Sequence, residues 1–227
     1  MTRFLLVVVL AGCGRIGFDV LPDVPSTPWA LIQTAAAQSS TLRLEPVGAQ
    51  HLVVVAVQIT DQSLATLIDD STCNTYVPIA AAHSFNANQG DELRLFYAKD
   101  TCAGARAITI TNASGVTAVA WEVSGIRTDD PLDSASTLND QPPTTTPVGP
   151  TITTSTAGEF VVSAAIVTNS VSGVVAGNGF TNDHLTNGNA WAHLTDSMAP
   201  AGEYQAQWNQ PMRGTYCASA AAFKVVP

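Results

Sequence analysis

From Trp29 onward the chain consists of short apolar or alternating runs separated by Gly, Asn, Asp and Pro. No stretch keeps the 3.6-residue period that a helix needs to bury one face, so the pattern predicts strands. Residues 107–111 alternate between apolar and polar side chains, whereas residues 52–57 form a continuous apolar run, typical of a strand buried on both faces. Many such runs with turn signals every 8 to 12 residues or so predict an all-β fold, an antiparallel two-sheet β-sandwich.

The predicted strands fall into two halves joined by a polar segment. Residues 50–55 recur in pattern at 158–163, and residues 117–122 resemble 219–224. Two similar halves would produce this echo, and so would two unrelated central strands. Residues 128–150, rich in Asp, Pro, Ser and Thr, predict a long connection across one sheet face or edge, within a single domain over residues 29–227. The predicted strands cover residues 29–36, 41–45, 51–60, 64–68, 75–83, 92–98, 105–112, 116–124, 151–155, 159–168, 190–196, 203–209 and 214–226.

The start of the chain predicts an export signal. Arg3 precedes an unbroken apolar run over residues 4–11, which Gly12 and Cys13 follow. The run is too short to cross a bilayer as a helix, which takes about 20 residues, but it has the three regions of a signal peptide. A plain secretory signal and a short buried strand are the alternatives. Residues 13–28, with three prolines, predict a flexible tether.

Residues 10–13, Leu-Ala-Gly-Cys, resemble the lipobox of bacterial lipoproteins. The resemblance implies that residues 1–12 are removed and that Cys13 is diacylated, which would anchor the chain stably in a membrane. Gly14, by the enterobacterial sorting convention, implies the outer membrane. Residues 13–19 also look like the start of many predicted lipoproteins of myxobacteria. We therefore expect a lipid-anchored protein of the bacterial cell envelope, in the outer membrane or on the cell surface.

The body of the chain resembles the jelly-roll, concanavalin-A-like sandwich modules of secreted and surface bacterial proteins. This resemblance implies a fold and a surface setting, and by association a glycan-binding or adhesive role. The segments that carry it are residues 49–56, 74–76, 95–100, 121–125 and 221–224.

The charge balance excludes nucleic acid as a partner. The chain has 9 Lys+Arg against 18 Asp+Glu, a formal net charge of −9, and its only lysines are Lys99 and Lys224. No basic stripe is therefore available to neutralise phosphates. The hydrophobic fraction of 46% and charged fraction of 12% also exclude a disordered acidic chain.

The cysteines predict one disulfide. With Cys13 assigned to lipid, export places the other three in an oxidising compartment, where one pair and one leftover is the simplest arrangement. Cys73 precedes a predicted strand and Cys102 follows a neighbouring one, so a pair between them is expected at one end of the sandwich. Cys217, within the last apolar strand, is expected as a small buried hydrophobe. A metal site is the alternative, but the chain has no C-x-x-C or H-x-x-x-H spacing.

No catalytic residue is predicted. The chain lacks a G-x-S-x-G elbow and any strand with two acids on one face. Glu122 stands alone on its strand and is expected to be a structural hydrogen-bond acceptor. Acids from different strands could still converge at the roughly 5 to 9 Å that glycoside hydrolysis requires, so a surface hydrolase acting on polysaccharide is the alternative function.

Calcium is the one ion that the sequence favours, although no cofactor is expected. Oxygen donors cluster without the spacing of a calcium loop, so the clusters are more typical of turns. They comprise Asp69, Asp70 and Ser71; Asp129, Asp130 and Asp133; and Asn178, Asn182 and Asp183.

Residues 177–191 combine aromatic rings with amides, the pattern of a sugar-binding loop. If they bind a ligand, both rings are exposed and the polar groups converge. The alternative is a Gly/Asn turn with both rings packed inward. The expected function is therefore a non-catalytic envelope protein that binds glycan or another surface component. The candidate ligand-binding residues are Phe180, Asn182, Asp183, Asn187 and Trp191.

Overall fold

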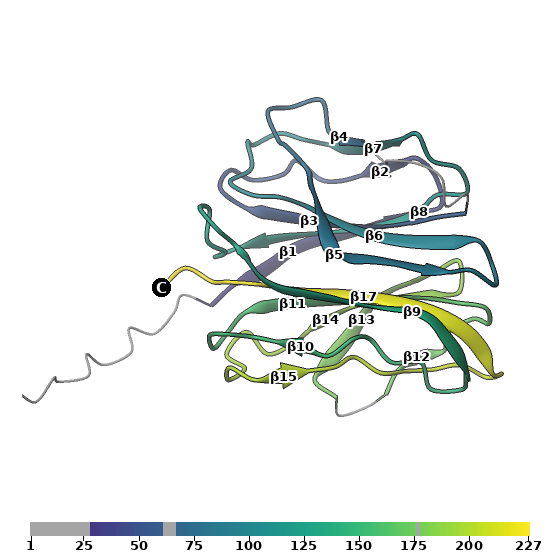
Figure 1. The fold of residues 1–227 in the computed structure, drawn as a ribbon. Coiled ribbons are helices and arrows are strands. Elements are labelled where there is room, and N and C mark those ends of the chain that lie inside the picture. The colour runs from purple at the N-terminus through teal and green to yellow at the C-terminus, as the bar shows by residue number, and fades with distance from the viewer. Residues whose placement is uncertain (1–27, 61–66, 176–177) are drawn as a thin grey trace, which may run out of the picture.

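The computed structural model describes residues 28–60, 67–175 and 178–227 (Figure 1). Over these ranges the chain forms strands and turns without a helix, which confirms the all-β prediction. This part of the chain accordingly offers no helix that could cross a membrane. The predicted signal peptide, Cys13 and the predicted tether up to residue 27 lie outside the described residues.

The strands divide between two halves of the chain. The first half holds β1 (Ala30–Ala37), β2 (Thr41–Arg43), β3 (Leu52–Ile59), β4 (Leu67–Asp69), β5 (Val77–Asn86), β6 (Asp91–Ala98), β7 (Ala107–Thr111) and β8 (Thr117–Ser124). The second half holds β9 (Leu132–Thr144), β10 (Ile152–Thr153), β11 (Phe160–Val167), β12 (Gly173–Val174), β13 (Phe180–Thr186), β14 (Asn189–Leu194), β15 (Glu203–Tyr204), β16 (Trp208–Asn209) and β17 (Gly214–Phe223).

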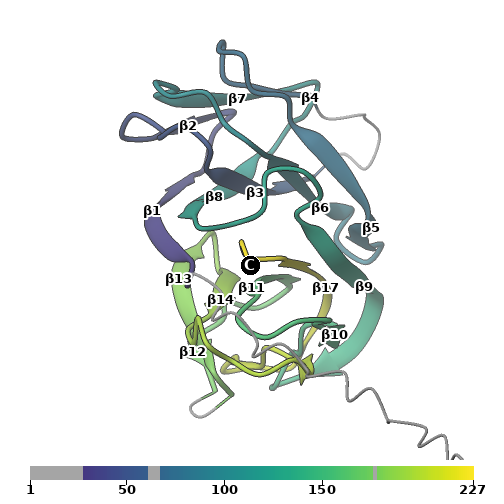
Figure 2. The same ribbon diagram turned by 90° about the vertical axis from the view of Figure 1, so that its left-hand side faces the viewer.

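Two five-stranded antiparallel sheets face each other, and each comes from one half of the chain. Their orders are β1-β8-β3-β6-β5 and β13-β14-β11-β17-β9. Figure 2 shows them stacked, with β1 near β13 at one margin and β5 beside β9 at the other. Small sheets cover the outer faces: β2-β7-β4 on the first half, and β10-β15 with β12-β16 on the second.

This layering creates three hydrophobic cores. Leu52, Val54 and Ala56 of β3 join the central core between the two large sheets. The alternating residues Val53 and Val55 join the outer core beneath β2-β7-β4. All eight residues of β3 are therefore buried, as the apolar run predicts. A two-sheet sandwich buries one face of each sheet, whereas in this chain both faces of the large sheets are covered.

Both halves follow one strand order. If β15 and β16 count as a single interrupted strand, each large sheet contains the first, eighth, third, sixth and fifth strand of its half. The sequence echo thus has a structural counterpart, with one correction. When Leu52 is aligned with Phe160, their partners on β8 and β17 are Val123 and Phe223. The echo instead matches Trp121 with Phe223 and is two residues out of register.

The polar midpoint segment contains a strand that the sequence pattern does not indicate. β9 lies at the edge of the second sheet and pairs with β17 through several register shifts. Pro142 and Pro143 fall within one of these shifts, where no ladder hydrogen bond is required of them. The segment does lie at a sheet edge, but as a long edge strand and not as a loop. Likewise β13 occupies residues expected to be a loop.

Candidate functional site

The described N- and C-terminal residues meet at one end of the molecule. A Cβ added to Gly125 would lie 3.0 Å from the Cα of Trp29, and the Val226 amide donates to the Gly125 carbonyl at 3.0 Å. β1 leads away from this end, and its eight residues at about 3.3 Å each span roughly 26 Å. Gln38, which directly follows β1, therefore lies at the opposite end of the sandwich.

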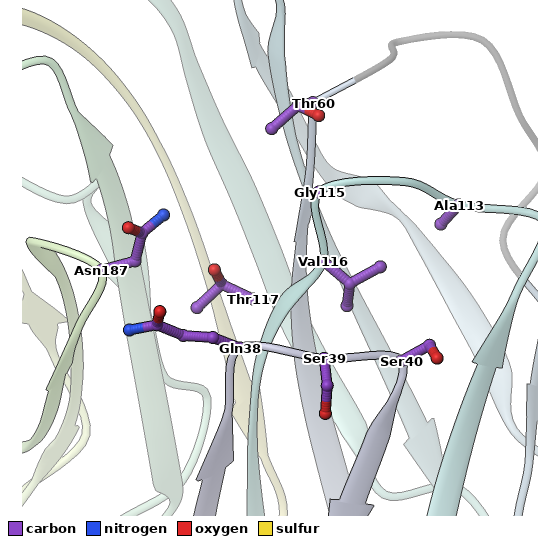
Figure 3. Close-up of a pocket in the computed structure, with 9 residues that line it drawn as sticks. All are labelled: Gln38, Ser39, Ser40, Thr60, Ala113, Gly115, Val116, Thr117 and Asn187. Atoms are coloured by element: carbon purple, nitrogen blue, oxygen red, sulfur yellow. The ribbon is translucent and has the colours of Figure 1, made fainter.

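A pocket of about 570 Å³ that is open to solvent, which we call the end cavity, lies at that opposite end. Its walls come from the turn after β1, the end of β3, the start of β8 and the turn between β13 and β14 (Figure 3). Among the described lining residues, Asn187 is the one that belongs to the second half of the chain. The lining residues are Gln38, Ser39, Ser40, Thr60, Ala113, Gly115, Val116, Thr117 and Asn187.

The lining of the end cavity is polar but uncharged. Hydroxyl and carboxamide groups donate and accept hydrogen bonds without ionising. Among the described residues that line it, none is acidic or basic, in a chain of net charge −9. The cavity therefore suits a neutral ligand rich in hydrogen-bonding groups.

Asn187 enters the cavity from a tight turn. Asn187 and Gly188 have φ values of 55° and 77°, and Thr186 pairs with Asn189 on either side. This is the left-handed geometry of a two-residue hairpin turn, for which Asn-Gly is the favoured sequence. Figure 3 shows Asn187 at one side of the cavity, with Gln38 and Thr117 across from it.

The two aromatic candidates do not face solvent. Phe180 is 7% exposed and Trp191 is 0% exposed; Phe180 packs into the outer core of the second half and Trp191 into the central core. The exposure that ligand binding would require is therefore absent, and the alternative of inward packing holds: both rings lie on strands of the β13–β14 hairpin, where burying an aromatic ring is favourable. Neither offers a face for a sugar.

Asn182 and Asp183 also lie away from the end cavity. The Asn182 amide donates to the His184 carbonyl at 3.2 Å. The Asp183 carboxylate accepts the Trp121 indole N–H at 2.7 Å and lies 2.8 Å from His193 Nδ1. Of the five candidates only Asn187 lines the cavity. The other lining residues were missed because ordinary Ser, Thr and Gln in distant turns carry no sequence signal.

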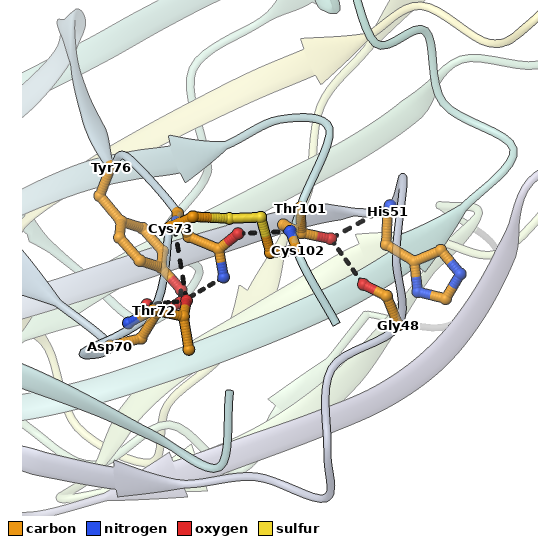
Figure 4. The surroundings of a disulfide bond; sticks show 9 residues. Gly48, His51, Asp70, Thr72, Cys73, Tyr76, Thr101 and Cys102 are labelled. Atoms are coloured by element: carbon orange, nitrogen blue, oxygen red, sulfur yellow. Dashed lines mark hydrogen bonds between the residues drawn. A yellow bond between two sulfur atoms is a disulfide. The ribbon is translucent and has the colours of Figure 1, made fainter. Parts of the chain in front are cut away.

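The Cys73–Cys102 disulfide is confirmed, with a Cα–Cα distance of 6.0 Å (Figure 4). The Asn74 carboxamide oxygen accepts the Cys102 amide at 2.7 Å beside it. Asp70 accepts the Asn74 amide at 2.6 Å and the Tyr76 hydroxyl at 3.0 Å. Burial, and then the charge of Asp70, raise the pKa of Tyr76. The Asp70 carboxylate thus holds the turn around the disulfide.

Glu122 is 1% exposed and accepts hydrogen bonds from several groups. The Gly48 amide donates to Oε1 at 2.7 Å, the Gln33 carboxamide donates to Oε2 at 2.5 Å, and His51 Nδ1 lies 2.5 Å from Oε1. A Cβ on Gly48 would overlap the His51 ring, so a glycine is required there. Glu122 is therefore the structural acceptor that the sequence predicts.

Asp133 of β9 and Glu159, which directly precedes β11, are acids that do converge. The Ser155 amide donates to both, at 2.8 and 3.1 Å, and the Glu159 carboxyl group lies against that of Asp133. Burial, with the nearby Asp133, raises the pKa of Glu159. Carboxyl groups in direct contact leave no room for the sugar that must lie between the acids of a glycoside hydrolase.

The other oxygen clusters also have protein partners. Asp129 pairs with Arg127, Asp130 with Lys224, and the Asn178 amide with the Gln207 carbonyl. Over the described ranges, no group of three or more His, Cys, Asp or Glu side chains is arranged to hold a metal ion. Cys217 is buried and unpaired, and burial raises its pKa to about 12.

Comparisons with known proteins add no relative: no family model matches the chain, and no curated protein or solved structure matches it significantly.

Proposed function

We propose that this chain is a lipid-anchored, non-catalytic protein of a bacterial cell envelope that binds a neutral glycan in the end cavity. Cys13 would carry the lipid, and the tether would join it to the body at Trp29. The observation that carries the proposal is that the cavity is lined by Gln38, at the far end of β1 from Trp29. A site in that position would face away from the membrane.

The chemistry of the cavity supports the choice of ligand. Small-molecule sites fix their ligands with a few convergent polar groups. Gln38, Thr60, Thr117 and Asn187 supply such groups without charge. A saccharide presents hydroxyls that both donate and accept, so each lining group can find a partner. An ionised ligand would find no opposite charge among the described lining residues.

The strand order supports a jelly-roll assignment for each half. In a jelly roll the first, eighth, third and sixth strands form one sheet, and the second, seventh, fourth and fifth form the other. The first half follows this order in β1-β8-β3-β6 and β2-β7-β4, with the fifth strand moved to the edge of the larger sheet. Jelly rolls are frequent in lectins, which favours sugar binding only by association.

A glycan array probed with the full chain in detergent tests the proposal. We expect neutral glycans to bind, and Asn187→Gly to weaken that binding while keeping the left-handed turn. Gln50→Gly is the matched control, because Gln50 also has a positive φ of 59° but is exposed outside the cavity. Binding only to charged glycans, or equal loss in both variants, would contradict the assignment.

A further inference from the structure

Two buried amides join the halves of the molecule next to the end cavity. Asn189, 2% exposed, donates from Nδ2 to Gln58 Oε1 at 2.6 Å. Its own Oδ1 accepts the Val167 amide at 3.1 Å. Gln58 is 3% exposed and belongs to β3. This amide bridge therefore connects β14 of the second half with β3 of the first.

The bridge is close to the cavity on both of its sides. Gln58 pairs with Thr117 across β3 and β8, and Thr60 follows two positions later; both threonines line the cavity. On the other side, Asn189 follows Asn187 by two positions. The bridge thus connects the part of the first half that contains Thr60 and Thr117 with the turn that contains Asn187.

The turn at Asn187 and Gly188 is also held by neighbouring residues of the second half. The Val171 amide donates to the Gly188 carbonyl at 2.8 Å, and a Cβ on Gly188 would lie 2.8 Å from Ser170 Oγ. The turn therefore has little freedom within its own half. Its position relative to the first half depends on contacts between the halves, and the Gln58–Asn189 bridge is such a contact.

The bridge is not expected to raise the folding stability more than two apolar side chains would. Burying two carboxamides costs desolvation that two apolar side chains of similar size would avoid. Buried polar groups can instead fix one arrangement among several packings. At the boundary between two halves, a directional amide pair fixes how one half sits against the other.

We propose that the end cavity is a composite site and that Gln58 and Asn189 are its positioning residues. They fix the distance between the Asn187 carboxamide and the hydroxyls of Thr60 and Thr117 in the first half. At this distance one neutral saccharide can hydrogen-bond to both sides of the cavity. This inference rests on the proposed function and adds that glycan affinity depends on how the two halves dock.

The test uses Gln58→Met, which keeps side-chain length but removes both the acceptor for Asn189 and the hydrogen bond to the buried Asp91 carboxyl group. Gln210→Met is the matched control: Gln210 is 4% exposed and donates to the Thr144 carbonyl, but it neither lines the cavity nor joins the bridge. The full chain in detergent is titrated with cellobiose and with N,N′-diacetylchitobiose by calorimetry. Gln58→Met should weaken binding about three- to ten-fold, the worth of one hydrogen bond, and Gln210→Met should leave it unchanged.

A double-mutant cycle separates positioning from general destabilisation. In an Asn187→Gly background, Gln58→Met should cost no further affinity, because the group it positions is gone. An equal loss in both backgrounds would overturn the proposal. Asn189→Asp, which keeps the acceptor for Val167 but loses the donor to Gln58, serves as the second variant if Gln58→Met does not fold.

Failure of the proposed function is distinguishable from failure of this inference. If neither disaccharide binds the unmodified chain, the glycan assignment fails for these probes. The positioning claim is then decided by nuclear magnetic resonance. Gln58→Met should shift the Asn187 side-chain amide signals and speed hydrogen exchange at Val171, whereas unchanged signals would overturn it.

Discussion

At the residue scale, Glu122 and Glu159 are almost equally buried, 1% and 2% exposed, yet their carboxylates have different partners. Both oxygens of Glu122 accept hydrogen bonds. Glu159 Oε1 accepts the Thr156 amide at 2.9 Å, but Oε2 is buried without a partner, and Asp133 lies against the group. An ionised carboxylate is thus compensated at Glu122 and penalised at Glu159.

The same substitution should therefore have opposite effects at the two positions. Glu159→Gln keeps the acceptor for Thr156, removes a charge beside Asp133 and should stabilise the protein by about 1 kcal/mol at neutral pH. Glu122→Gln places an N–H group against the Gln33 donor and should cost about 2 kcal/mol. Urea unfolding measures both. Destabilisation by Glu159→Gln at neutral pH would contradict this account.

The pH dependence of this difference follows from the raised pKa of Glu159. The folded state keeps the proton to a higher pH than the unfolded state, so unfolding stability falls as pH rises from about 4.5 through the raised pKa. The Glu159→Gln variant has no ionisable group at this position, so its unfolding stability does not fall in this way. Its advantage over the unmodified chain should be near zero at about pH 4 and grow toward neutral pH. An advantage that shrinks with rising pH would show that the group is ionised and stabilised in the fold.

At the element scale, strands with an apolar pattern could be predicted from the sequence, and strands without one could not. β3 and β11 are predicted well because all of their side chains are buried. β9 carries mostly Ser, Thr, Asn and Pro because it lies at a sheet edge and is only partly covered. β13 follows Asn178 and Gly179, and its polar residues Asp183 and His184 contact Trp121 and Thr34 of the first half. Edge strands depend on tertiary pairing that local composition does not encode.

The loop closed by the disulfide gives a prediction at this scale. Cys73 and Cys102 are 29 residues apart and close a loop containing β5 and β6. Closing a loop of this length restricts the unfolded chain, so replacing both cysteines with serine should lower unfolding stability by about 3 kcal/mol. Urea denaturation under oxidising conditions measures the change. Reducing agent should destabilise the unmodified chain to a similar extent but leave the double variant unaffected. Unchanged stability in the double variant would count against the pairing.

At the scale of the whole molecule, the two large sheets share a central core, and the end cavity takes residues from both halves. The disulfide and the role of Glu122 could be predicted because each follows from local chemistry. The cavity could not, because Gln38 and Asn187 meet only after the halves dock. Of the predicted ligand loop, the turn residue Asn187 reaches the cavity, while its aromatic neighbours are drawn into cores.

Anchoring is the prediction that belongs to the whole chain. Cys13→Ser removes the only predicted acylation site, and stable membrane binding by acylation requires two lipid signals. The variant should leave the detergent phase in phase partitioning and be released from washed membranes. The unmodified chain is the control and should stay with the membranes. Retention of the variant would contradict the lipobox assignment.

The central claim is that a neutral glycan occupies the end cavity, and chemical-shift mapping tests it most directly. The ¹⁵N-labelled chain is titrated with the strongest neutral hit of the glycan array. The account predicts that the perturbed amides cluster at residues 38–40, 113–117 and 187, with Thr60 among them and the disulfide turn around Cys73 unaffected. Perturbations centred on the opposite end of the sandwich, near Trp29 and Glu159, would contradict it.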